Sequence, residues 1–368
     1  MACYVTVHTN LRPRSVVMLA AICHGRKDLR IENVEDRPLG TREVRVAVAY
    51  GGICGSDLHY YHRGAVGDFA LREPMALGHE ISGVVLETGA DVSGLKKGVK
   101  AALDPSRPCL TCRFCRGGRS NLCTNMFFLG SAGRFPHVQG GFAQHLILRD
   151  DQIVAVPDDT DLLKLSVAEP LSVGLHAVNR AGPLMGKRVI VSGSGPIGLL
   201  TARSARFAGA EEVVSTDVVD APLAVARAHM HATRTVNVAT NPEGLVEFEA
   251  DGGYFDIAFE ASGSPAALAS LFKVIRRGGR IVQVGMLASG TTPVPVNMLQ
   301  SREFELVGAF RATDEFRLAV ELIVAGKIDV SAILSGTYPL MQAASALELA
   351  GDRSKVVKLH LALNGELV

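Results

Sequence analysis

Four cysteines stand close together in one stretch rich in glycine and arginine. Cys109, Cys112, Cys115 and Cys123 follow the spacing C-x2-C-x2-C-x7-C. Four thiolates at this spacing can surround one tetrahedral zinc ion at about 2.3 Å per bond, which makes a closed structural site. Bacterial ferredoxins place their fourth cysteine after three residues and before a proline, whereas here seven residues intervene and Thr124 follows. The pattern therefore favours structural zinc over an iron–sulfur cluster, with a zinc-ribbon nucleic-acid module and free thiols as further alternatives.

A second group of potential ligands is scattered along the chain. Cys54 lies in "GGICGSDLHY", His79 and Glu80 in "ALGHEISG", and Glu169 in "SVAEPLSVGLHAV". Each of these residues taken alone is more simply explained as a packing or helix-start residue. Taken together, one thiolate, one imidazole and one or two carboxylates can form a mixed zinc site that leaves a position for water or an alcohol.

A glycine-rich turn follows an apolar run in "VIVSGSGPIGLL". The residues of this turn are Gly193, Gly195, Pro196, Ile197 and Gly198. A G-x-G-x-x-G turn between a strand and a helix is typical of dinucleotide binding, because it lets the backbone approach the pyrophosphate. About twenty residues later, Asp217 ends a second predicted strand and can accept hydrogen bonds from a ribose 2′-hydroxyl. Since the two following residues are valines and offer no arginine for a 2′-phosphate, we infer NAD rather than NADP. The alternative is an ordinary strand, turn and helix with a surface aspartate.

The elements that must position these residues change in type along the chain. From Met18 to about residue 160, short Val- and Ile-rich runs separated by glycines predict a mostly antiparallel β unit. From about 165 to 310, buried strands alternate with helical stretches, which predicts βαβ units on a parallel sheet. The last apolar run, 354–363, is expected to rejoin the first unit. Residues 1–17 show no clear periodicity and are expected to form a disordered extension, or to precede the true start at Met18.

The composition limits the kinds of partner. With 368 residues the chain is long enough for two domains. Its 38 basic and 37 acidic residues leave a net charge of +1, so we expect neither nucleic acid nor a membrane surface as a partner. No apolar run approaches the roughly 18 residues of a membrane span, and the first residues lack a signal-peptide core. A cytoplasmic location is expected, where seven cysteines favour metal binding over disulfides.

In combination these motifs resemble a known family, the zinc-dependent medium-chain alcohol and polyol dehydrogenases. The motifs are G-I-C-G-S-D-L-H, G-H-E, a four-cysteine lobe, A-E-P and G-S-G-P-I-G, and in this order they cover the chain from about residue 18 to its end. The resemblance implies an α/β fold of two domains: a GroES-like β-rich catalytic domain over 18–162 and 310–368, and a Rossmann domain with a doubly wound parallel sheet over 163–309. Several stretches, such as "GSAGRFPHVQGGF", are more similar still to one sugar-acid dehydrogenase of this family.

The resemblance also implies the metal sites and the reaction. Cys54, His79 and Glu80 would hold a catalytic zinc, with Glu169 as a direct or water-bridged fourth ligand. The polyol branch shares both glutamates, whereas the alcohol-dehydrogenase branch has a cysteine in place of Glu169. With the structural zinc, each subunit would bind two zinc ions and one NAD and oxidise a secondary alcohol of a sugar acid. Family members are dimers or tetramers, so a homodimer or homotetramer is expected.

The same resemblance suggests roles for the residues that follow Cys54. Ser56 would take the proton of the alcohol and pass it through the cofactor ribose to His59, whose ordinary pKa near 6.5 suits exchange with solvent. Asp57 would orient His79 by accepting its second N–H.

Substrate recognition is less clear from the sequence. Tyr60 could bond to substrate hydroxyl groups, and Arg311 stands where the polyol branch has an arginine in its pocket. A substrate carboxylate requires a cation, for which Arg311 and Arg63 are equal candidates. Two alternative functions also remain: a sorbitol- or xylitol-type polyol dehydrogenase, and a non-catalytic protein that binds zinc and nucleotide.

Overall fold

The structure is a computed structural model that describes residues 17–364. The first described residue, Val17, already belongs to strand β1 (Val17–Gly25), so the fold begins one residue before the predicted start at Met18. The rest of the predicted N-terminal extension lies outside the described residues.

The first unit of the fold is built from antiparallel strands around β3 (Glu43–Gly52). This strand pairs with β7 (Glu80–Thr88), with β11 (His145–Arg149) and with β20 (Lys358–Ala362). Most of β3 is buried, as expected for the valine-rich run "EVRVAVAYGG" in the middle of a sheet. The remaining strands of this sheet are β8 (Lys100–Leu103), β12 (Ile153–Ala155) and β19 (Leu334–Pro339). The pairing of β20 with β3 returns the end of the chain to the first unit.

Smaller elements surround this sheet. A three-stranded sheet has the order β2-β1-β6, and two short hairpin-like pairs join β4 with β5 and β9 with β10. The strands are β2 (Asp28–Glu35), β4 (Ala65–Val66), β5 (Phe69–Ala70), β6 (Met75–Ala76), β9 (Ser106–Arg107) and β10 (Phe127–Phe128). The helices that follow the strands of this unit are α1 (Gly55–Arg63), α2 (Arg113–Arg116), α3 (Leu162–Leu165) and α10 (Ala343–Ala350).

The second unit is a six-stranded parallel sheet with the order β15-β14-β13-β16-β17-β18. Its strands are β13 (Arg188–Ser192), β14 (Glu212–Asp217), β15 (Arg234–Asn237), β16 (Phe255–Glu260), β17 (Ile275–Gln283) and β18 (Glu305–Gly308). Its helices are α4 (Ala168–Ala181), α5 (Pro196–Phe207), α6 (Asp220–His229), α7 (Pro265–Val274), α8 (Val296–Arg302) and α9 (Glu315–Val324). In chain order this is 3-2-1-4-5-6, the doubly wound arrangement in which ligands bind where the strand order reverses, between β13 and β16.

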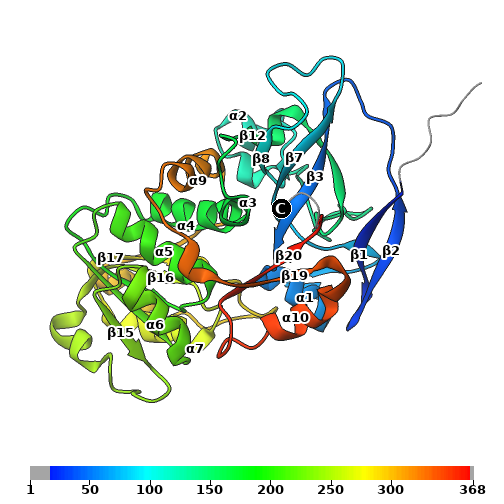
Figure 1. Ribbon diagram of the computed structural model, residues 1–368. Coiled ribbons are helices and arrows are strands. Elements are labelled where there is room, and N and C mark those ends of the chain that lie inside the picture. Colours follow the sequence, from blue (N-terminus) through cyan, green and yellow to red (C-terminus); the bar gives the residue numbers. More distant parts are fainter. Residues whose placement is uncertain (1–16, 365–368) are drawn as a thin grey trace, which may run out of the picture.

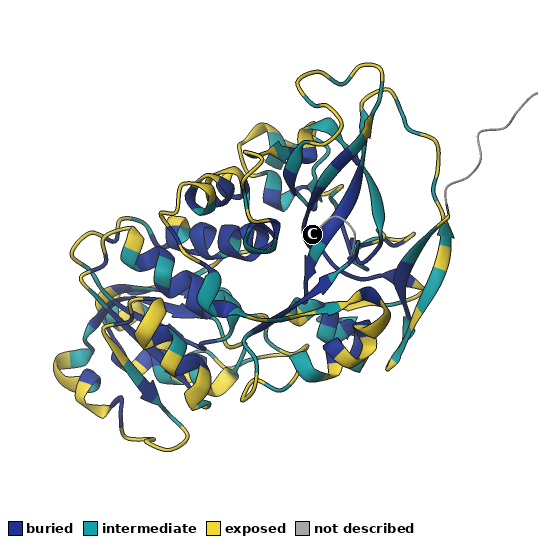
Figure 2. Ribbon diagram, viewed as in Figure 1, coloured by how far each residue is buried: buried dark blue, intermediate teal, exposed yellow. Residues whose placement is uncertain are grey.

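The two units lie side by side, with α4 and α9 near their junction (Figure 1). Both sheets are buried, whereas exposed residues gather on the outer helices and loops (Figure 2). The predicted fold class, a β-rich unit with a parallel α/β unit, is confirmed. The domain bounds of 18–162 with 310–368 and of 163–309 stay a prediction. None of the helices between residues 17 and 364 is long and apolar enough to cross a membrane.

Candidate active site

The buried Asp57 joins the two backbone segments that carry Cys54 and His79. Cys54 is the residue before α1, in an extended conformation. The carboxylate of Asp57 accepts 2.9 Å hydrogen bonds from the backbone N–H of Cys54 and from that of Gly78. No hydrogen bond joins Asp57 to the His79 ring, whose Nδ1 has no hydrogen-bond partner. Asp57 thus holds the two turns together, and its contact with the second N–H of His79 stays a prediction.

Three potential metal ligands meet beside this carboxylate. One ligand atom from each of Cys54, His79 and Glu80 lies within 4.8 Å of the others. His79 Nδ1 and Glu80 Oε1 are buried without a hydrogen bond, whereas Glu80 Oε2 faces the ammonium group of Lys358. Such groups cost about 1–3 kcal/mol each when nothing satisfies them, and a cation bound among them would remove this cost. A sulfur, a nitrogen and an oxygen donor around one point suit Zn²⁺, so the residues fit the metal.

Glu169 lies near this group but not within it. Its position in the first turn of α4 leaves it outside the set of mutually close ligand atoms. Burial raises the pKa of Glu169 to about 7, and the charges of His79 and Glu80 act on it. Glu169 is thus a neighbour of the three ligands, and its direct or water-bridged ligation of zinc stays a prediction.

Lys358 in β20 was not found by the sequence analysis. Its Nζ lies 2.5 Å from Glu80 Oε2 and donates a 3.1 Å hydrogen bond to the carbonyl of Ile53. Both side chains of the ion pair are only 1 % exposed. A lysine in the apolar run "VVKLHLAL" is a signal that could have indicated a buried partner, because an unpaired charge is rarely found inside a sheet.

Ser56 and His59 lie three residues apart on α1 and therefore on one face of the helix. Both are partly exposed. Burial, together with the charge of Arg63, lowers the pKa of His59. This arrangement is compatible with the proton relay, whose residues stay a prediction.

A cavity of about 560 Å³ opens beside the ligand group. The polar and aromatic residues that line it include Asn121, Asn125, Phe128, Ser131, Arg134 and Arg311. The guanidinium of Arg311 lies 4.3 Å above the Phe128 ring, and that ring lies 5.3 Å from the ring of His79. Arg311 thus adds a cation to the lining of the cavity, next to the aromatic ring that separates the cavity from His79.

The other two residues considered for the substrate lie elsewhere. Tyr60 is 2 % exposed, its oxygen accepts a 2.9 Å hydrogen bond from the Ala132 N–H, and it does not line this cavity. Tyr60 thus lies behind the Ser131–Gly133 segment of the cavity wall, and its contact with substrate stays a prediction. Arg63 is exposed at the end of α1 and is also absent from the lining. Of the two candidate cations, the geometry favours Arg311.

The glycine-rich turn has the shape that a bound pyrophosphate requires. Gly193 has φ +93°, and a Cβ there would lie 2.7 Å from the Ser262 nitrogen. A Cβ on Gly198 would lie 1.8 Å from the Gly193 carbonyl oxygen, whereas one on Gly195 would meet nothing within 4 Å. Gly195 precedes α5, and no side chain caps this helix end. The open space at Gly195 and the unpaired N–H groups beyond it fit a phosphate.

Asp217 ends β14 at the rim of an adjoining cavity of about 380 Å³. Its carboxylate accepts hydrogen bonds from three backbone N–H groups, those of Ser194, Val218 and Val219. Arg353, which the sequence analysis did not consider, also donates to it at 2.5 Å. Since Arg353 is 136 residues away in the chain, no local pattern could have found this contact.

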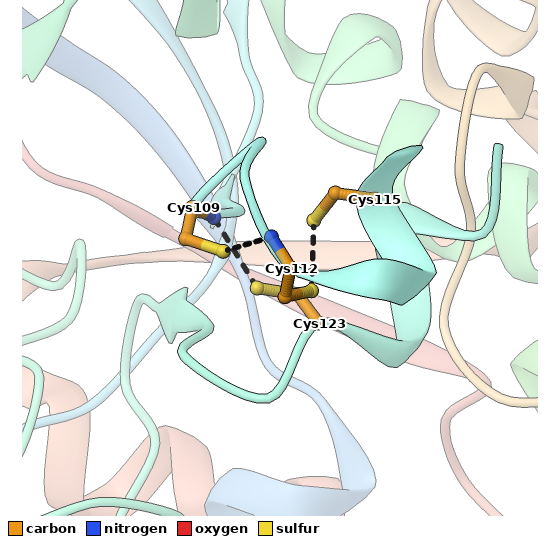
Figure 3. A group of neighbouring side chains, drawn as sticks. All are labelled: Cys109, Cys112, Cys115 and Cys123. Carbon is orange, nitrogen blue, oxygen red and sulfur yellow. Dashed lines mark hydrogen bonds between the residues drawn. The ribbon is translucent and has the colours of Figure 1, made fainter. Parts of the chain in front are cut away.

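The side chains of Cys109, Cys112, Cys115 and Cys123 point toward one another in one lobe (Figure 3). Their sulfur atoms lie within 4.8 Å of one another. Backbone N–H groups point at the sulfur atoms: that of Cys112 at Cys109 Sγ (3.3 Å), and that of Cys109 at Cys123 Sγ (3.2 Å). Such donors stabilise thiolates, the form that binds metal. The lobe thus fits the closed tetrahedral zinc site expected from the spacing.

Cys115→Ser tests this lobe. We expect metal analysis to show one zinc ion fewer per chain and the free energy of unfolding to fall by at least about 2 kcal/mol, because loss of a structural metal is among the strongly destabilising changes. Arg119→Ala, an exposed change in the same lobe, is the control and should alter neither quantity. An unchanged zinc content in the serine variant would contradict a four-cysteine site.

Comparison with known proteins agrees with this site. Residues 40–158 match the alcohol dehydrogenase GroES-like domain, and residues 196–325 match the zinc-binding dehydrogenase domain. The chain is 41 % identical to L-idonate 5-dehydrogenase (NAD(P)(+)) of Escherichia coli, over 86 % of this chain and 90 % of that protein. It is 33 % identical to sorbitol dehydrogenase of Bacillus subtilis, over 90 % and 93 %. The crystal structure of the E. coli L-idonate 5-dehydrogenase covers 95 % of this chain and 99 % of its own, with a TM-score of 0.89 and 37 % identity.

Fold and site together define a zinc-dependent, NAD(P)-linked dehydrogenase. The chain belongs to the zinc-binding medium-chain dehydrogenase family.

Proposed function

We propose that this enzyme reversibly oxidises a secondary alcohol of a sugar acid, L-idonate, to 5-keto-D-gluconate with NAD. The observation that carries the proposal is that Arg311 lines the 560 Å³ cavity and stacks on Phe128, whose ring lies 5.3 Å from the ring of His79. A carboxylate bound by this guanidinium would hold the far end of the substrate while its hydroxyl group reaches Cys54, His79 and Glu80. The similarity to a protein named for L-idonate supports this choice of acid.

Each residue of the site has a separate role in the proposed reaction. Cys54, His79 and Glu80 would hold zinc, which when bound lowers the pKa of a coordinated hydroxyl group. Ser56 would accept the proton of the alcohol and His59 would release it to solvent. Asp57 holds the two ligand-bearing turns at their separation through its backbone bonds. The turn at Gly193–Gly198, with Pro196 and Ile197 at the helix start, would bind the pyrophosphate. Asp217 would accept a hydrogen bond from the ribose 2′-hydroxyl, which favours NAD.

The remaining parts of the proposal are the second metal and the assembly. The four-cysteine lobe would bind one structural zinc, so each subunit would contain two zinc ions. A homodimer or homotetramer is proposed from the family.

A polyol such as sorbitol or xylitol is the second candidate substrate. The similarity to a sorbitol dehydrogenase favours it, as do the asparagine and serine side chains of the cavity, which can bond to neutral hydroxyl groups. Both candidates use the same metal ligands and cofactor turn, and they differ in whether Arg311 binds a carboxylate of the substrate.

Initial rates of NADH formation by the purified enzyme test whether the substrate is a sugar acid or a polyol. L-idonate, D-gluconate, D-sorbitol and xylitol would be compared at equal concentrations. We expect L-idonate to give the highest kcat/KM. A dominant rate with sorbitol or xylitol would overturn the sugar acid and leave the dehydrogenase chemistry intact.

Arg311→Met should separate the two classes of substrate. Hydrogen bonds to charged groups contribute about 1.5–3 kcal/mol, so the KM for L-idonate should rise by roughly 10- to 150-fold. The kcat/KM for D-sorbitol should change by less than about threefold. Arg63→Met, on the exposed end of α1, is the control. If it raises the KM for L-idonate instead, the carboxylate has been assigned to the wrong arginine.

A further inference from the structure

The carboxylate that would select NAD already has a cationic partner. Arg353 lies in the turn between α10 and β20, at the end of the chain that returns to the first unit, yet its Nη2 donates to Asp217 Oδ2 in the second unit at 2.5 Å. The side chain of Asp217 is 2 % exposed and that of Arg353 46 % exposed. Arg353 and Asp217 thus both line the 380 Å³ cavity, and in Figure 1 the red segment after α10 passes toward α7.

The contact between Arg353 and Asp217 affects how the site distinguishes NAD from NADP. A carboxylate without a partner repels a 2′-phosphate, but here Arg353 and three backbone N–H groups all donate to Asp217. The negative charge is thus largely compensated at the point where a 2′-substituent would lie. A guanidinium also carries five donors in a planar fork that matches a phosphate group. Lys273 of α7 and Glu249 line the same cavity with opposite charges, so Arg353 is the cation that acts on the position beside Asp217.

We propose that Arg353 is the residue that determines how tightly this enzyme binds NADP relative to NAD. With NAD, Asp217 accepts the ribose 2′-hydroxyl. With NADP, the guanidinium of Arg353 keeps its bond to Asp217 and donates from its remaining N–H groups to the 2′-phosphate. This inference rests on the proposed dinucleotide role of the glycine-rich turn and replaces the strict NAD preference expected from the two valines after Asp217.

Direct binding of NADH and NADPH, measured by nicotinamide fluorescence and by titration calorimetry, tests the proposal without any substrate. We expect the wild-type Kd for NADPH to lie within about tenfold of that for NADH. In Arg353→Ala the Kd for NADPH should rise at least about tenfold, the lower end of the effect of a lost charged hydrogen bond, while the Kd for NADH changes less than about threefold. Lys355→Ala is the matched control, because Lys355 is in the same turn but pairs with Asp352.

Two results would overturn the assignment. One is a ratio of the two Kd values that stays the same in Arg353→Ala, and the other is a wild-type enzyme that binds NADPH more than about 100-fold more weakly than NADH. A second variant, Asp217→Ala, should shift the ratio toward NADPH as long as Arg353 is present, and should shift it much less in the double variant. Because the measurement needs no alcohol, failure of L-idonate as the substrate leaves this test intact.

Discussion

Cys54→Ala should lose about one zinc ion per chain and at least about 10³-fold in kcat/KM. The side chain supplies the only sulfur in the group with His79 and Glu80, whose ligand atoms lie within 4.8 Å of one another. Without it, two ligands remain, fewer than the three protein ligands typical of catalytic zinc sites. Lewis-acid stabilisation contributes several kcal/mol to a transition state, and each 1.36 kcal/mol corresponds to a factor of ten in rate.

Metal analysis and initial rates with L-idonate and D-sorbitol check this result, whichever substrate proves better. Cys23→Ala is the matched control, because Cys23 is fully buried in β1 and makes its hydrogen bond to the Gly25 carbonyl. It should change thermal stability modestly and keep the zinc content and the activity. Full activity of Cys54→Ala at reduced zinc content would show that the proposed ligand group is not the catalytic centre.

Lys358→Met should destabilise the enzyme more than any other single change proposed above. It removes the only cation paired with Glu80 among the described residues and leaves a carboxylate that is 1 % exposed. Breaking a buried ion pair by removing one partner costs about 3–5 kcal/mol. For domains of 150–250 residues this corresponds to a fall in Tm of roughly 6–20 °C.

Thermal denaturation of the zinc-loaded enzyme measures the effect. The double variant Lys358→Met with Glu80→Gln is the control. It removes the uncompensated charge and should regain part of the lost stability. Its affinity for zinc should be lower than that of the wild type, because Glu80 is one of the proposed ligands. A fall in Tm of less than about 2 °C in Lys358→Met would mean that the metal alone compensates Glu80.

Much of the site could be recognised before the fold was known. The four cysteines are local in the chain, and a closed metal lobe depends mostly on their spacing. The glycine-rich turn is also local, because a strand, a tight bend and a helix start follow one another directly. The alternation of strand and helix predicted the parallel sheet for the same reason, since each βαβ unit is contiguous in sequence.

Two residues beside the site make contacts with distant segments that no local pattern could have indicated. Asp57 accepts a hydrogen bond from the Gly78 backbone, and Tyr60 turns its oxygen to Ala132. Their residue types permitted the expected roles, but packing decided the direction in which each side chain points.

By itself, the sequence determined the fold class, the four-cysteine lobe, the cofactor turn and the set of residues able to bind zinc. These follow from residue types and short spacings, which local geometry translates directly into structure. Only the tertiary structure decided that Arg311 and not Arg63 lines the larger cavity, that Lys358 pairs with Glu80, and that Arg353 pairs with Asp217. Each of these depends on a segment near the C-terminus that returns across the molecule. A charge is stabilised by its neighbours in space, whatever their separation along the chain.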